Sequence, residues 1–260
     1  MKPTRWKLKI ALVLVGLAAV IAARLLWPSV SFWYARRQLL RTLERVTQSD
    51  RSALNCVLAA EIENVPPRDG EGQRITYRTG GYVFSLPAAT YRRKDPNQPG
   101  VLESDRLSVH VLGVGPETPQ LAENMAPREP EVVDYFRRTD PYQILVDAYT
   151  TTPADVEASA TRPEFEKALQ LIMLRSIVQP VGSDKLWMRF TARGRKGFLA
   201  GDTTCQYVYT SIYLPEGKEF AAVTLQPKQG TALDDIWACL GSLLIEVDPN
   251  VAASMPSPLR

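Results

Sequence analysis

The sequence predicts an α+β protein in which an N-terminal transmembrane helix is followed by one helix–sheet–helix domain with a mostly antiparallel sheet. Three observations predict it: an uncharged apolar run near the N-terminus, segments of alternating apolar and polar residues joined by short turns, and amphipathic helical segments. Strands joined by tight turns run antiparallel. With 45% hydrophobic and 23% charged residues, the composition is that of a globular chain.

The N-terminal segment has the pattern of a membrane anchor. Residues 10–23 read IALVLVGLAAVIAA without a charge, and after Arg24 apolar residues continue to Trp27. We expect a basic tail at 1–9 and a transmembrane anchor at 10–27, because tryptophans and basic residues at the two ends suit the bilayer interfaces. The residues expected to hold the anchor there are Trp6, Lys7, Lys9, Arg24 and Trp27.

Two properties of the anchor stay open at this point. Val20-Ile21-Ala22 could serve as a signal-peptide cleavage site, but the apolar sequence LLWPSVSFWY that follows favours an uncleaved anchor. Bases flank both ends of the run almost equally, so orientation depends on the short basic tail. Such tails usually stay in the cytoplasm, and we therefore expect a single-pass membrane protein whose soluble domain is extracytoplasmic.

Residues 28–50 are expected to form a juxtamembrane amphipathic helix. An apolar stripe formed by Leu39, Leu40, Leu43 and Val46 leaves the arginines on other faces. The helix either lies on anionic lipid or packs as a stalk on the domain, and the pattern does not separate the two. The arginines that would contact lipid or another anion are Arg36, Arg37 and Arg41.

The soluble α+β domain is expected at 51–248, with a disordered tail at 249–260. Residues 64–74 are expected to be a loop. Strands are expected at GYVFSLPA (81–88), at 106–112, as two strands in 186–202 around a turn at 193–197, and as a hairpin of 204–214 with 219–226. Helices are expected at 163–178 and 232–244, and capping boxes begin at Thr152, Thr161 and Thr231.

Several strands are apolar on both faces, so other elements must pack on both sides of the sheet. Tyr207 and Tyr209 point away from the face that carries Val208 and Ile212. The two expected helices could supply that cover, one on each side.

This order of elements resembles the PsbP-like fold family. The matching features are a strand ending in FSLP, a helical middle, an antiparallel meander and a closing helix, LDDIWACLGSLLI, within residues 82–245. The insertion at 131–180 departs from the family's compact pattern. The resemblance implies a binding or assembly module attached to a membrane or membrane complex, and it carries over no catalytic residues.

Candidate chemical groups are few. His110 is the only histidine, and it lies opposite the apolar face of its strand with no nucleophile motif nearby, so we expect a sheet-surface residue. The basic turn of Arg193, Arg195 and Lys196 either binds an anion or lipid headgroup or is simply solvated. Cys205 and Cys239 would meet in a disulfide if the closing helix covered the Tyr207 and Tyr209 face; otherwise they are buried thiols.

Charge argues against nucleic acid as a partner. Residues 1–47 hold nine bases and one acid, and the remainder holds 22 bases and 27 acids, so the soluble part is mildly acidic. We therefore expect no nucleic acid as a partner. We also expect no cofactor, and the partners expected are membrane lipid and a protein of the membrane or envelope. The expected function is a non-enzymatic binding or assembly module. The alternatives are a hydrolase that uses carboxylates and a lipid- or apolar-ligand-binding domain, and the shape of the largest pocket would distinguish them.

Overall fold

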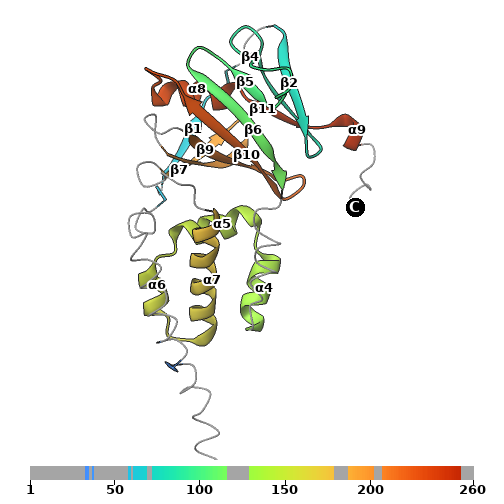
Figure 1. Ribbon diagram of the computed structural model, residues 1–260. Helices are drawn as coiled ribbons and strands as arrows, with labels where there is room; N and C mark the ends of the chain where they lie inside the picture. Colours follow the sequence, from blue (N-terminus) through green and yellow to red (C-terminus); the bar gives the residue numbers. More distant parts are fainter. Residues whose placement is uncertain are drawn as a thin grey trace, which may run out of the picture. The chain divides into compact units, whose positions relative to one another are not determined.

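The computed structural model describes residues 33, 34, 37, 58–59, 61–68, 72–115, 129–178, 187–201 and 207–252 (Figure 1). The chain divides into two compact units, Met1–Asp50 and Arg51–Arg260. Among the described residues, no helix is long and apolar enough to cross a membrane. The expected anchor at 10–27 lies outside these residues, as do the side chains assigned to its two ends and Arg36, Arg41 and Cys205.

The second unit has the expected α+β class, and its sheets are mostly antiparallel. The described strands form two sheets, where the sequence pattern predicts one. The larger sheet has the order β1-β7-β8-β9-β10-β6-β5-β4 and the smaller one β11-β3-β2; only β1, beside β7, pairs in parallel. The strands are β1 (Ile62–Val65), β2 (Arg74–Thr79), β3 (Tyr82–Pro87), β4 (Arg92–Arg93), β5 (Val101–Glu103), β6 (Leu107–Gly115), β7 (Trp187–Ala192), β8 (Arg195–Ala200), β9 (Val208–Leu214), β10 (Glu219–Pro227) and β11 (Leu244–Val247).

Two hairpins organise the centre of the larger sheet. Residues 215–218 join β9 to β10 as a four-residue turn, so the hairpin predicted here is confirmed. The β7–β8 turn is tighter than expected, because β8 already begins at Arg195. Its two residues, Arg193 and Gly194, have φ angles of 51° and 77°, which fits a type I′ turn.

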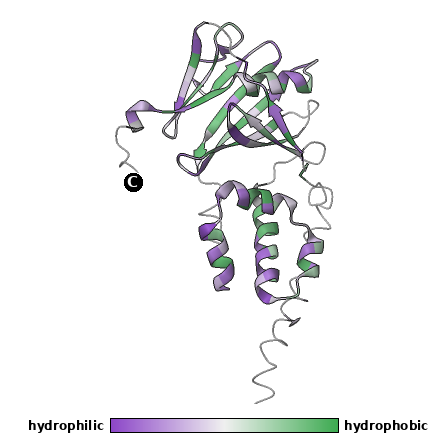
Figure 2. Cartoon of the chain, turned by 180° about the vertical axis from the view of Figure 1, so that it is seen from behind, coloured by the Kyte–Doolittle hydropathy of each residue, from purple (hydrophilic) through white to green (hydrophobic). Residues whose placement is uncertain are grey.

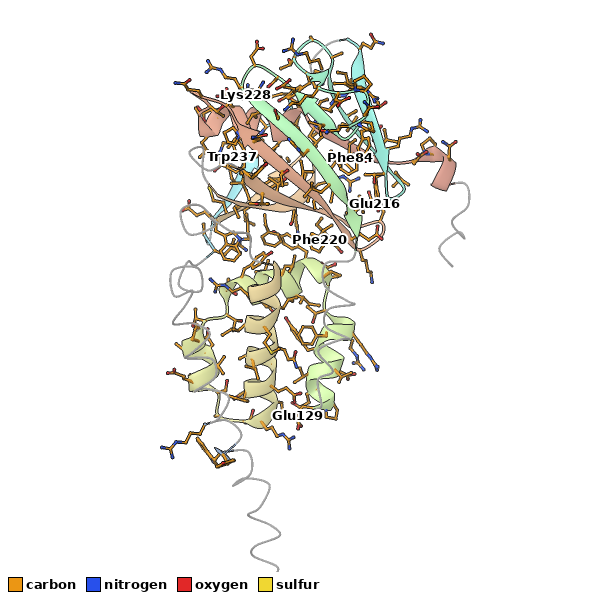
Figure 3. The ribbon with its side chains drawn as sticks, viewed as in Figure 1. Phe84, Glu129, Glu216, Phe220, Lys228 and Trp237 are labelled. Carbon is orange, nitrogen blue, oxygen red and sulfur yellow. The ribbon has the colours of Figure 1, made fainter. Side chains whose placement is uncertain are left out.

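The two sheets pack face to face around the main core. The alternation expected for β3 and β6 is confirmed: each buries three consecutive inward residues, which are Tyr82, Phe84 and Leu86 and then Leu107, Val109 and Val111. Helix α8 (Leu233–Ser242) completes the same core through Ile236, Cys239 and Leu240. Figure 3 shows Phe84 and Trp237 on this side of the larger sheet. One face of the large sheet is thus covered by the small sheet and α8 together.

The opposite face of the large sheet is covered in part by helices, which pack on β7 to β10. Four helices follow β6: α4 (Pro130–Arg138), α5 (Pro141–Thr150), α6 (Pro153–Ala158) and α7 (Arg162–Val178). Figure 1 shows α4 and α6 on either side of α7. In Figure 2 the α7 ribbon turns from hydrophilic to hydrophobic toward its C-terminal end, where Leu171 and Leu174 are buried. This apolar end reaches the sheet, and we call α4–α7 the helical lobe.

An aromatic cluster joins the helical lobe to the sheet. Tyr142 of α5 stacks on Phe198 with ring centres 4.9 Å apart. The ring centre of Tyr149 lies 4.4 Å from that of Trp187 and 5.0 Å from that of Phe198. Tyr213 Oη donates a hydrogen bond of 2.8 Å to Oδ2 of Asp140 at the start of α5. Phe220, on the same face, belongs to this cluster (Figure 3). Side chains from β7 to β10 therefore hold α5 in place.

Two of the three expected capping boxes are confirmed. The Thr152 backbone N–H donates to Asp155 Oδ2 at 2.7 Å, and that of Thr161 donates to Glu164 Oε2 at 3.1 Å. The third was assigned to the wrong residues. Helix α8 begins at Leu233, and its Asp235 accepts from the Ala232 N–H at 2.8 Å.

Several boundaries from the sequence analysis were wrong. The loop expected at 64–74 contains the end of β1 and the first residue of β2. The closing helix ends at Ser242 rather than 244, because the chain turns there and pairs with β3 as β11. The tail expected to be disordered from 249 begins with a short helix, α9 (Pro249–Ala252), so the domain continues past 248.

Candidate functional site

An open groove of about 340 Å³ lies in the helical lobe between α5, α6 and α7. Its polar lining includes Asp147, Asp155, Glu164 and Lys167. The capping-box pattern had pointed to Asp155 and Glu164, but nothing in the sequence placed them beside Asp147. This groove is neither a deep cleft nor a closed apolar cavity.

The three carboxylates of the groove are already engaged in hydrogen bonds. Asp147 accepts from Tyr135 Oη at 2.5 Å and from Gln143 Nε2 at 2.7 Å. Asp155 and Glu164 each hold the start of a helix, as described above. Burial, followed by the hydrogen bond to Asp147, raises the pKa of Tyr135, so its hydroxyl stays protonated. The arrangement is suited to fixing helix ends rather than to moving protons.

The lysine of the groove also has a partner. Lys167 Nζ lies 3.7 Å above the centre of the Tyr135 ring, a cation–π contact that joins α7 to α4. The described residues include no group of three or more His, Cys, Asp or Glu able to hold a metal ion.

The three basic residues of the β7–β8 hairpin do not converge on one site. Arg193 Nε donates to the Gly241 carbonyl at 2.8 Å, at the end of α8. Arg195 makes two hydrogen bonds to Glu216, at 2.9 and 3.0 Å, and a third to the Ile245 carbonyl. Lys196 points to the other face of the sheet, where its Nζ lies 5.3 Å from the Tyr142 ring centre. The two arginines therefore fasten the β7–β8 hairpin to the end of α8 and to β11.

The Arg195–Glu216 pair lies at the edge of the core. The hydrogen bonds from Arg195 lower the pKa of Glu216. The side chain of Arg195 is 16% exposed and that of Glu216 is 42% exposed, so water weakens their attraction. This contact joins β8 to the turn between β9 and β10. Arg37, another described arginine among the expected lipid contacts, lies in the first unit.

Cys239 is fully buried on α8, in the core between the two sheets. Burial raises the pKa of its thiol to about 11, against a smaller opposing effect of a hydrogen bond with Tyr91. A disulfide between Cys205 and Cys239, the alternative to two buried thiols, required α8 to cover the Tyr209 face of β9. That condition is not met, because α8 packs on the face that carries Val208 and Ile212.

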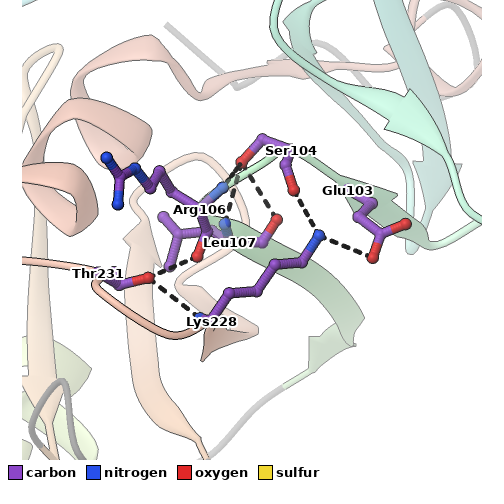
Figure 4. Close-up of polar contacts among 6 residues, drawn as sticks. All are labelled: Glu103, Ser104, Arg106, Leu107, Lys228 and Thr231. Carbon is purple, nitrogen blue, oxygen red and sulfur yellow. Dashed lines mark hydrogen bonds and ion pairs between the residues drawn. The ribbon is translucent and has the colours of Figure 1, made fainter.

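A second polar network fixes the β5–β6 turn to the segment between β10 and α8 (Figure 4). Lys228 Nζ donates to the Ser104 carbonyl at 2.6 Å and lies 2.9 Å from Glu103 Oε1. Thr231 Oγ1 donates to the Arg106 carbonyl at 2.6 Å and accepts from the Lys228 N–H at 3.0 Å. The Lys228 hydrogen bond lowers the pKa of Glu103. These polar groups are paired with one another and position α8.

His110 is half-buried on β6, on the face of the sheet that the helical lobe partly covers. Its ring meets Tyr207 edge-on at 6.4 Å between centres. Burial, followed by repulsion from Lys94, lowers its pKa, so the imidazole is neutral at pH 7. In the pairing register Val101, His110, Thr224 and Tyr209 lie side by side across four strands.

A β-bulge in β6 leaves Leu112 without a pairing residue on β10, on the same face of the sheet as His110. Val111 pairs with Val223 and Gly113 with Ala222, so Leu112 is the extra residue of β6. Its side chain is 64% exposed. Val109 and Val111, which point to the opposite face of the sheet, are buried. We call the surface formed by Val101, His110, Tyr209, Ala222 and Leu112 the bulge face.

No protein-family model, curated protein or solved structure matches this chain. The resemblance to the PsbP-like fold family therefore stays a prediction.

Proposed function

We propose that the chain is a membrane-anchored, non-enzymatic binding or assembly module whose bulge face contacts a protein partner of the membrane or envelope. The membrane part of the proposal rests on the apolar run at 10–23 and the tryptophans and bases at its ends. The short basic tail favours an extracytoplasmic domain.

The observation that carries the binding part is the exposed leucine at the bulge. Bulges redirect side chains and occur often beside functional sites. Here the redirected residue is Leu112. The other residues of the bulge face are half-buried and carry no formal charge, and the nearby charge that acts on them is that of Lys94, beside His110. An apolar side chain surrounded by such residues suits the core of a protein contact, where charged residues are depleted.

The groove of the helical lobe supports the non-enzymatic reading over the hydrolase alternative. Its carboxylates hold helix ends and a tyrosine hydroxyl, as the distances above show. A carboxylate general acid or base needs instead to reach a substrate and to have its pKa moved toward the working pH. For Glu164 the shift is in the other direction, since hydrogen bonds from Thr161 and Ala160 lower its pKa.

The proposal is tested by partner recovery from detergent-solubilised membranes with the tagged full-length chain. Leu112→Glu should reduce recovery of the partner about tenfold or more, which corresponds to about 1.4 kcal/mol of binding free energy. Ile62→Glu is the matched control, because Ile62 is also an exposed aliphatic residue (44%) of the large sheet but lies on its edge strand β1.

Equal recovery with wild type and Leu112→Glu would overturn the assignment of the bulge face. Equal loss in both variants would mean that the added charge, and not its place, is responsible. Both substitutions are at exposed positions and should change the free energy of unfolding by less than about 0.5 kcal/mol, which urea melts can check.

A further inference from the structure

We draw no further inference here: the strongest candidate, the open acidic groove between α5, α6 and α7, is lined by carboxylates that already hold helix ends and the Tyr135 hydroxyl, and no described group around it points to a ligand.

Discussion

Replacing Phe198 by alanine should strongly destabilise the second unit, because this ring joins the helical lobe to the sheet. Phe198 is 3% exposed and contacts both Tyr142 and Tyr149 of α5. Truncation of a buried phenylalanine costs about 3–5 kcal/mol. Two aromatic pairs, each worth roughly 0.5–1.5 kcal/mol beyond area burial, place the expected loss in the upper half of that range.

The assay is urea unfolding of residues 51–260, with the free energy of unfolding extrapolated to water. A loss of about 4–5 kcal/mol is a large part of the 5–15 kcal/mol that stabilises a typical domain. Phe198→Leu is the control, since it keeps most of the apolar volume and should cost about 1–1.5 kcal/mol. A loss below about 1 kcal/mol for the alanine variant would refute the packing of α5 on this face.

Two further predictions concern polar groups. Tyr142→Phe should leave the free energy of unfolding unchanged within about 0.5 kcal/mol or raise it, because the Tyr142 hydroxyl is buried and has no hydrogen-bond partner in the described part of the chain; a loss above 1 kcal/mol in urea melts would contradict this. Glu216→Gln should cost less than about 1 kcal/mol at pH 7. The folded-state pKa of Glu216 lies below its unfolded value of about 4.3, so its stabilisation is present above that pH and is lost as the pH falls through the lower folded value. Melts at pH 7 and at several values below 4.3 should therefore show a shallower decline in the variant, and identical slopes would count against the Arg195–Glu216 contact.

Alternation predicted the strands that have one buried face. In β3 and β6 every second residue is apolar and enters the core, so the pattern can be read locally. By contrast, β1 has three exposed residues, and β11 continues the apolar stripe of α8 without a turn residue between them. Whether such short segments are strands depends on pairing with β7 and β3, which are distant in sequence.

The helical lobe could have been located more fully from the sequence. Helices α4 and α5 both begin with proline after an acidic residue, at Glu129-Pro130 and Asp140-Pro141, a common pattern for the first turn. Which elements pack on each face of the large sheet was harder to predict from the sequence. The small sheet shares one face with α8, because β2 and β3 fold onto the large sheet and add a layer that no local pattern indicates.

The role proposed for Leu112 could be predicted from the sequence only in part. Leu112 stands out in the sequence as an apolar residue on the same strand face as His110, but its place as the unpaired residue of a bulge follows from the register shift between β6 and β10. The basic turn illustrates the opposite case. The cluster Arg193, Arg195 and Lys196 is compact in sequence, yet the strand sends its members to opposite faces, and the arginines find acceptors on α8, β11 and Glu216.

The most direct test of the central claim is membrane fractionation of the full-length chain followed by a carbonate wash. The proposed anchor at 10–27 predicts that intact protein stays in the membrane pellet, because a spanning helix is not released by high pH. Recovery of intact protein in the wash supernatant would contradict the anchor, and a chain shortened by about twenty residues would show that the segment is a cleaved signal peptide.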